Sequence, residues 1–546
     1  MYDKPLIVHP NSRNIYVVED LDITGEVSQQ LVQFADLKQA PEQVHTYTIS
    51  PYTLWTAKAK GMEADEIVSF LETNSQNKIP DWFKSTIQKD INQFGSLKFS
   101  VRGDDLILTG STEEIIKDIK GLEEITNKGY VEVNTTTLMF KLRYRREIKK
   151  ILFDMDYFVK DAVYQSGEEI DIHLLEGNLA DYQTEAITSY MKYNEQAGGG
   201  GTIIMPPNSG KILAGLKIME NLKTSTLIIV EDKQRMDKWH QEIMDRTDVH
   251  EGNISLFENS EAAIKPITIG TYDTISANVE KMTGFGFVIY DDAHKLPTPT
   301  HEVTTEIHSK NKLALASTLA RADGGGNLVF ALIGPKWYEV LHRTLVHKKY
   351  QVPVNCVEIK IPLPTDERRE YERRNPNNKY NPDSSNSYKR EAASIILQKK
   401  KSKRALLVTY YSPLIKKYAD SFGLPLLSSH LNDEERKPLI ETFNNQEVNK
   451  LVTASKLIEN MQLKAIDTMI SLSYHQGSER EEYLRLGKLL PADGGKKEAC
   501  YYALVSRNTE EEKFYSKRRR EMINYGFVYK IRTFEELVER GEFFES

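Results

Sequence analysis

The 546-residue sequence lacks the features that mark membrane, secreted or metal-binding proteins. No run approaches the roughly 18 uninterrupted apolar residues of a membrane-spanning helix, and the N-terminus lacks a charged segment followed by an apolar one. The chain has two cysteines, Cys356 and Cys500, which lie far apart in apolar surroundings. They form neither a metal-binding spacing nor a disulfide framework. We therefore expect a cytoplasmic protein with no membrane partner.

An excess of positive charge is also absent, because 72 Lys and Arg residues stand against 79 Asp and Glu residues and give a net charge of −7. The whole chain is therefore not a basic nucleic-acid binder, and any contact with a polyanion must come from local patches. The candidates are Lys399–Lys401 with Lys403 and Arg404, and Lys517–Arg520. The alternative is that these runs are solvated helix faces.

The length suggests roughly three or four domains, and the pattern of apolar runs divides the chain into four parts. Residues 1–120 alternate short strands and helices, and residues 121–177 form a small connecting domain with a basic stretch. In residues 178–350 and again in 351–546, buried apolar runs alternate with helices, which predicts parallel sheets of an α/β fold. The polar stretch at about 364–391 is an insertion in the last part.

The expected strands can be placed on individual apolar runs. At the N-terminus, Leu6–Val8 and Ile15–Val18 are expected to form a hairpin. The two α/β sets are similar in size, which indicates two copies of one lobe. Their expected strands are Thr202–Met205, Thr226–Val230, Ile267–Ile269, Phe287–Tyr290 and Leu313–Ala316, then Ala405–Val408, Leu424–Leu427, Lys450–Thr453, Thr468–Ile470 and Ala499–Val505.

The stretch Ile203–Ile212 contains most parts of a phosphate-binding loop. In such a loop the backbone N–H groups and a helix N-terminus hold the phosphates, and a lysine reaches the β- and γ-phosphates. The Ser or Thr that would ligate Mg²⁺ is missing, since a branched hydrocarbon, Ile212, follows the Gly-Lys pair and cannot bind a hard cation. The alternative is a chance Gly-Lys pair after an apolar strand. The candidate cofactor-binding residues are Asn208, Ser209, Gly210 and Lys211.

A pair of carboxylates follows the apolar run at 287–290. An acidic pair at the C-terminal end of a buried strand faces the ligand crevice of an open α/β sheet. Asp291 would hold Mg²⁺ through water, Asp292 would orient or deprotonate the attacking water, and His294 completes the motif. The alternative is a strand exit capped by Asp. Together with the loop, the pair predicts a site for ATP and Mg²⁺ in the first lobe.

At this point the chain resembles the bacterial branch of the XPB-type helicases, which are superfamily 2 DNA translocases. The resemblance extends over nearly the whole chain and implies two tandem RecA-like lobes behind an N-terminal α/β domain. It also implies that Gln183 approaches the adenine and that DNA is a partner. The matching segments are Pro5–Val8, Phe34–Leu37, Pro41–Tyr47, Pro51–Trp55, Leu179–Gln183, Ile269–Tyr272, Leu332–Lys336 and Leu486–Gly487.

The sequence departs from the pattern of this family at the positions that serve hydrolysis. Asp292 replaces a glutamate and is one methylene shorter, and misplacement by about an ångström can cost roughly a hundredfold in rate. Lys488 replaces the first finger-type arginine, and the second has no counterpart. An arginine finger is worth about 10³ to 10⁵ in rate. With Ile212, these losses predict that the fold is kept while hydrolysis is weak or lost.

The resemblance also implies contacts with DNA across both lobes and through a thumb-like insertion at about 364–391. Interleaved arginine and tyrosine suit phosphate contact and base stacking. The alternative is a charged helix in which Glu370 and Glu372 alternate with the arginines. The candidate DNA-binding residues are Arg321, Arg368, Arg369, Tyr371, Arg373 and Arg374.

Two functions follow from these observations. The first is a DNA-binding pseudo-helicase or scaffold that holds DNA and ATP without efficient hydrolysis. By resemblance, its protein partner would be a nuclease or an active helicase paralogue. The second is an active ATP-dependent DNA helicase or translocase that acts in DNA repair.

Overall fold

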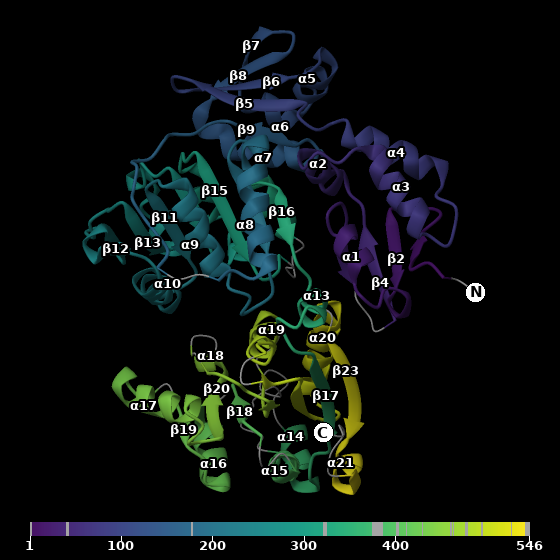
Figure 1. Cartoon of the computed structure of the whole chain (residues 1–546), viewed down its shortest axis with the longest axis vertical. Helices are drawn as coiled ribbons and strands as arrows, with labels where there is room; N and C mark the ends of the chain where they lie inside the picture. The colour runs from purple at the N-terminus through teal and green to yellow at the C-terminus, as the bar shows by residue number, and fades with distance from the viewer. Residues whose placement is uncertain are drawn as a thin grey trace. The chain divides into compact units, whose positions relative to one another are not determined.

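The computed structural model separates into two compact units, Met1–Leu37 with Thr46–Leu341, and Lys38–His45 with His342–Ser546 (Figure 1). Among the helices that the structure describes, none has the length and apolar character of a membrane span. The described residues are 3–39, 43–175, 178–319, 325–373, 386–399, 403–410, 412–428, 430–458, 461, 463–474, 479–492, 495–525 and 527–540.

A four-stranded sheet with the order β1-β2-β4-β3 forms the core of the N-terminal part. β1 pairs antiparallel with β2, and Leu6 lies opposite Val17, which confirms the expected hairpin. Alternate residues of both strands are buried, as one covered sheet face requires. The elements are β1 (Leu6–Val8), β2 (Asn14–Val18), α1 (Glu26–Leu31), β3 (Asp36–Gln39), β4 (Val44–Thr48), α2 (Pro51–Ala59), α3 (Ala64–Asn74) and α4 (Asp81–Ile91).

A second sheet, with the order β7-β8-β6-β5-β9, extends across residue 120. The domain boundary expected there therefore does not separate the two sheets, and the chain passes from one to the other between α4 and β5. The elements of this part are β5 (Leu97–Arg102), β6 (Asp105–Gly110), α5 (Glu113–Lys120), α6 (Glu123–Thr126), β7 (Val131–Asn134), β8 (Thr137–Lys141), α7 (Arg145–Asp154) and β9 (Val159–Asp161).

The basic stretch of this part serves the interior of the first unit. Buried Asp161 lies 2.6 Å from Arg145 Nη2 and 2.8 Å from Lys149 Nζ. Both cations also donate to backbone carbonyls of the following lobe, Arg145 to Thr305 at 3.3 Å and Lys149 to Leu332 at 3.3 Å. Because buried charges persist only when they are paired and hydrogen-bonded, this cluster joins α7 to the lobe.

The first lobe contains a parallel seven-stranded sheet with the order β12-β13-β11-β14-β15-β10-β16. Its central strands are buried on both faces, which accounts for their continuous apolar sequences. The strands are β10 (Gly200–Ile204), β11 (Thr226–Val230), β12 (Ile254–Phe257), β13 (Ile267–Thr271), β14 (Phe287–Tyr290), β15 (Asn311–Ala316) and β16 (Lys336–Glu339). The helices are α8 (Asp181–Tyr193), α9 (Lys211–Leu222), α10 (Lys233–Arg246), α11 (Tyr272–Ser276) and α12 (Leu328–Leu332).

The second lobe has a parallel seven-stranded sheet with the order β19-β20-β18-β21-β22-β17-β23. The two sheets confirm the predicted α/β class with two parallel lobes behind an N-terminal α/β part. The strands are β17 (Val354–Ile361), β18 (Ala405–Thr409), β19 (Leu426–Leu427), β20 (Lys450–Ala454), β21 (Thr468–Ser471), β22 (Ala499–Ser506) and β23 (Val528–Thr533). The helices are α13 (His342–His347), α14 (Thr365–Arg373), α15 (Ser387–Lys399), α16 (Ser412–Phe422), α17 (Asp433–Asn444), α18 (Ser455–Ile458), α19 (Glu479–Gly487), α20 (Glu510–Asn524) and α21 (Phe534–Arg540).

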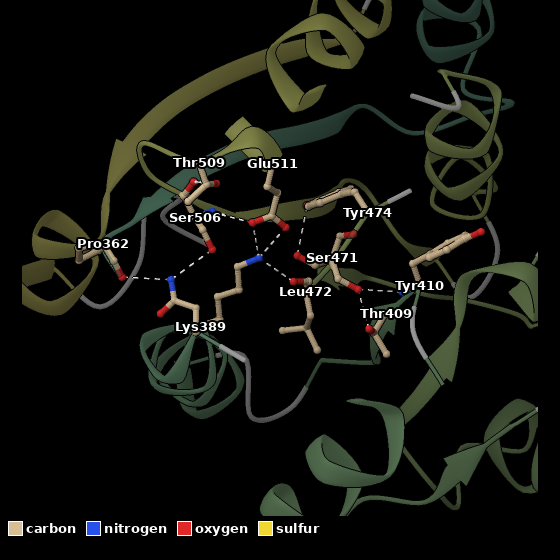
Figure 2. Close-up of polar contacts among 12 residues, drawn as sticks. Pro362, Lys389, Thr409, Tyr410, Ser471, Leu472, Tyr474, Ser506, Thr509 and Glu511 are labelled. Carbon is tan, nitrogen blue, oxygen red and sulfur yellow. Dashed lines mark hydrogen bonds and ion pairs between the residues drawn. The ribbon is translucent and has the colours of Figure 1, made fainter. Parts of the chain in front are cut away.

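A buried polar network joins α15 to the C-terminal ends of the second lobe's strands (Figure 2). Lys389 Nζ lies 2.7 Å from Glu511 Oε1 and donates to the Leu472 carbonyl at 2.9 Å. Glu511 in turn accepts a hydrogen bond from the Ser506 N–H at 2.9 Å. The lysine side chain is 6% exposed. α15, whose first turn overlaps the insertion predicted at about 364–391, is therefore held by a charge pair as well as by apolar packing.

Lys389→Met should lower the free energy of unfolding of the second lobe by about 3 to 5 kcal/mol, because Glu511 would remain as an unpaired buried charge. Calorimetric unfolding of the full chain measures this as a lower transition temperature for that lobe. Arg390→Ala, which removes an exposed cation from the next position, is the matched control and should change stability by less than about 0.5 kcal/mol. Equal effects of the two substitutions would contradict the assignment.

Candidate functional site

The phosphate-binding loop connects β10 to α9 at the C-terminal edge of the first lobe's sheet. Asn208 has a φ of 55° and Gly210 a φ of 81°, so both adopt the left-handed conformation. Glycine adopts it without steric cost and asparagine tolerates it. Asn208 therefore supports the turn, and α9 begins at Lys211 directly after Gly210.

The residues before α8 and in its first turn hold this loop. Gln183 Nε2 donates to the Ser209 carbonyl at 2.8 Å, and the Tyr182 hydroxyl donates to the same oxygen at 2.9 Å. Gln183 Oε1 accepts from the Ala180 N–H at 3.0 Å. A Cβ on Gly210 would lie 2.3 Å from Gln183 Nε2, so only glycine leaves room for this contact. The predicted residues Gln183, Ser209 and Gly210 therefore meet, and Tyr182 joins them.

Lys211 is 7% exposed and its ammonium group lies inside the loop. Its Nζ donates to the carbonyls of Met205 at 3.2 Å and Pro206 at 3.1 Å, and to Ser317 Oγ at 2.7 Å. Burial lowers the pKa of Lys211 to about 8, although the charge of Asp292 acts in the opposite direction. The amine is thus held in the cradle where phosphates bind in loops of this kind.

Asp291 is fully buried at the end of β14, and its carboxylate is occupied by protein donors. Oδ2 accepts from Arg235 Nε at 2.6 Å and from Trp239 Nε1 at 2.7 Å, while Oδ1 accepts from the Asp292 N–H at 3.0 Å. Burial opposes the charge of Arg235, but Asp291 and Asp292 outweigh it and raise the pKa of Arg235 above its ordinary value.

Sequence reasoning did not identify Arg235 and Trp239 as site residues. They lie four residues apart on α10, a spacing that places side chains on one helix face. Asp232 caps this helix by accepting from the Arg235 N–H at 2.8 Å. The available signal was this i, i+4 pair directly after a buried strand of the lobe, and its meaning depends on the proximity of α10 to β14.

The residues present do not fit Mg²⁺. Ile212, at the position of the expected hydroxyl, is a buried hydrocarbon, and the carboxylate of Asp291 is engaged by Arg235 and Trp239. Asp292 lies 3.6 Å from Arg235 Nε, and His294 is half-buried in the next turn. The charges of both carboxylates therefore act on Lys211, as predicted for a nucleotide site, but the guanidinium of Arg235 also lies at these carboxylates.

The predicted finger residue belongs to the second unit. Lys488 follows α19, is half-buried, and donates from Nζ to the Met461 carbonyl at 2.9 Å. Three residues earlier, Arg485 is fully buried and lies 3.5 Å from Glu482. This motif is therefore built into the packing of its own lobe.

The predicted DNA-binding residues divide into two groups. Arg368 donates to the carbonyls of Asn508 at 2.9 Å and Arg507 at 3.0 Å, and the buried Tyr371 accepts from the Glu510 N–H at 3.0 Å. These two side chains dock α14 onto the loop that precedes α20. Exposed side chains on α14 include Arg369 and Arg373. The predicted residues Arg321 and Arg374 lie outside the described residues.

The basic run Lys517–Arg520 is neither a solvated helix face nor a simple basic patch. The guanidinium of Arg518 is 4.6 Å from the ring centroid of Tyr474, and the residue is 1% exposed. Arg519 pairs with the buried carboxylate of Glu358. At least half of this run therefore stabilises the core of the second lobe.

Trp239→Phe should lower the stability of the first unit by about 1 to 3 kcal/mol, because the buried Asp291 loses one donor while most of the apolar packing remains. Thermal unfolding followed by circular dichroism measures the change. Trp82→Phe is the control, since Trp82 is exposed and donates to the Pro10 carbonyl. A Trp239→Phe protein as stable as this control would contradict a supporting role for the indole.

Three family descriptions match successive parts of the chain. The ERCC3/RAD25/XPB C-terminal helicase matches residues 345–544, the type III restriction enzyme res subunit matches 176–321, and a helicase conserved C-terminal domain matches 6–133. Two of the three descriptions name helicases, and the matches together extend from the N-terminal sheet to the end of the second lobe.

Curated relatives match over nearly the full length. The chain is 29% identical to the DNA 3'-5' helicase XPB of Mycobacterium tuberculosis over 553 residues, which covers 98% of this chain and 99% of that protein. It is 26% identical to the general transcription and DNA repair factor IIH helicase/translocase subunit XPB of Enterocytozoon bieneusi, with 93% and 90% covered.

The fold has a counterpart among solved structures. The ATP-dependent type ISP restriction-modification enzyme LlaBIII bound to DNA matches with a TM-score of 0.50 and 12% identity, over 65% of this chain and 31% of that one. Its likeness concerns the fold alone. With two parallel lobes, a phosphate-binding loop and the full-length matches, the chain is similar to the XPB-type helicases over nearly its whole length.

Proposed function

We propose that this protein binds ATP and DNA but hydrolyses ATP slowly or not at all. The observation that carries the proposal is the Asp291 carboxylate, which accepts hydrogen bonds from Arg235 and Trp239 in place of serving a metal. The names of the relatives support DNA as a ligand. Acting as a scaffold, the protein would work with a partner, for which we propose a nuclease or an active helicase paralogue.

Nucleotide binding is supported by groups that do not depend on Ile212. The loop is shaped by Gln183 and Tyr182 through the Ser209 carbonyl. The ammonium of Lys211 is already in place, and its neutral oxygen partners are weaker acceptors than phosphate oxygens. An incoming phosphate would therefore exchange neutral hydrogen bonds for charge-assisted ones.

Loss of hydrolysis is supported by three separate groups. Without a hydroxyl at position 212, the start of α9 offers no side-chain oxygen at the position that ligates the metal in such loops. The carboxylate of Asp292 is one methylene short, so it orients an attacking water less well. Lys488 keeps a positive charge but lacks the planar fork that contacts phosphate in a bidentate manner.

The alternative function is an active ATP-dependent DNA helicase or translocase in DNA repair. It is favoured by the names of the relatives, which include a DNA 3'-5' helicase and a DNA repair factor subunit. Binding of ATP and DNA is common to both functions, so turnover separates them.

DNA-stimulated ATP turnover by the purified chain should equal that of the Lys211→Ala variant and lie at least about a thousandfold below a competent site, given the missing finger arginines. Phosphate release with and without DNA measures it. The variant Ile212→Thr, Asp292→Glu, Lys488→Arg should gain little, because Arg235 still occupies Asp291. Robust turnover by the unmodified chain would establish the alternative function instead.

ATP binding should weaken as the pH rises above about 8. The pKa of Lys211 in the free protein is about 8, because burial lowers it, and phosphate binds the protonated amine. Above that pH the free protein must take up a proton to bind, so the Kd should rise by up to about tenfold per pH unit. Below it the Kd should be constant.

Calorimetric titration of ATP over this pH range, in buffers that differ in ionisation enthalpy, measures both the Kd and the proton uptake. Lys211→Arg is the matched control, since a guanidinium stays charged throughout and its Kd should not depend on pH. A pH-independent Kd of the unmodified chain would refute the role of Lys211.

DNA binding should depend on the exposed arginines of α14 and not on the docked ones. Arg369→Ala with Arg373→Ala should weaken binding to mixed-sequence DNA and reduce its salt slope by about 1 for each phosphate that the protein no longer neutralises. Fluorescence anisotropy at several salt concentrations measures both. Lys513→Ala, at an exposed residue paired with Glu510, is the control. An unchanged salt slope would support the charged-helix alternative.

A further inference from the structure

The guanidinium of Arg235 lies against the carboxylate that the family resemblance assigns to Mg²⁺. We infer that Arg235 replaces the charge of the metal ion, so that the first lobe holds the phosphates of ATP or ADP without a divalent cation. This inference rests on the proposed nucleotide binding and specifies how the binding occurs.

The hydrogen bonds of Asp291 leave little capacity for a metal. An ionised carboxylate offers about four acceptor positions. Arg235 Nε, Trp239 Nε1 and the Asp292 N–H use three of them, at 2.6, 2.7 and 3.0 Å. A metal bound through water needs such positions for the water molecules. One position stays open, so Asp291 can accept at most about one hydrogen bond from such a water while Arg235 is in place.

The position of Arg235 is built into the helices around it. Asp232 caps α10 and fixes the Arg235 backbone. One turn later, the Trp239 indole is seated over Gly215 of α9, where a Cβ would lie 2.8 Å from Trp239 Cη2. α9 is the helix that begins with Lys211. The gap at Gly215 therefore lets α10 approach closely enough for both donors to reach Asp291.

The terminal nitrogens of Arg235 remain available for a ligand. Nε is the atom that donates to Asp291, and Nη1 and Nη2 make no hydrogen bond with any residue in the described part of the chain. The side chain is 20% exposed. A guanidinium has five N–H donors, so four of them can serve phosphate oxygens while Nε stays on the carboxylate.

Calorimetric titration of the full-length chain with ATP, in Mg²⁺ and then in EDTA, tests the inference. We expect the Kd to agree within about twofold between the two conditions, since the protein supplies the cation. In EDTA, Arg235→Ala should raise the Kd by at least about tenfold, the equivalent of losing one modest charge interaction. Lys233→Ala is the matched control, because Lys233 is an exposed cation in the same turn of α10. Its Nζ pairs with Glu258 at 2.8 Å and not with Asp291.

Arg235→Lys is included because Arg235→Ala leaves a buried carboxylate with less compensation and can unfold. It keeps the charge but lacks the fork, so its Kd should lie between those of the unmodified chain and Arg235→Ala. Binding by the unmodified chain only in Mg²⁺ would overturn the role of Arg235 while leaving nucleotide binding intact. Absence of ATP binding in both conditions would overturn the proposed function itself.

Discussion

The buried ion pair between Asp291 and Arg235 is the interaction on which the chemistry of the first lobe depends. A fully buried carboxylate is tolerated only when hydrogen bonds and an opposite charge compensate its lost hydration. Arg235, Trp239 and the Asp292 N–H supply these contacts. The same contacts hold α10 against β14 and use the oxygens that a metal would need. On our proposal, the stability of the lobe and its binding of nucleotide without Mg²⁺ are therefore two results of one arrangement.

The strands that the sequence predicts well are those covered on both faces. β11 and β14 begin and end where their apolar runs do, because every residue in them is buried. β17 is not predicted, since Glu358 and Lys360 interrupt its apolar sequence. In the fold Glu358 is buried and pairs with Lys360 and with Arg519 of α20. The positive charge of Arg519 that compensates Glu358 comes from a helix distant in the sequence, so no local sequence pattern indicates that Glu358 can be buried in a strand.

The residues of the site also differ in how far local sequence predicts them. Lys211 and the Asp291–Asp292 pair follow from motifs that lie at strand ends, and in the fold both carboxylates act electrostatically on Lys211. Their role in nucleotide binding stays a prediction. Arg235 escapes prediction because its partner lies 56 residues away, and a helical arginine normally reaches solvent. Arg368 is partly exposed but uses its guanidinium to dock a helix on backbone carbonyls, and Arg518 is buried against aromatic rings. Counting basic residues therefore overstates the surface available to DNA.

The close approach at Gly215 bears on how readily the present form of the site could change during evolution. The indole of Trp239 fits only while residue 215 is glycine, and it occupies the helix face that also carries Arg235. A hydroxyl at position 212 is one substitution away. Loss of the Arg235 guanidinium by substitution is harder, because a variant without it would carry the uncompensated charge of Asp291 in the core. A lineage with this packing is thus held in its present state by the demands of folding, independently of any selection on catalysis.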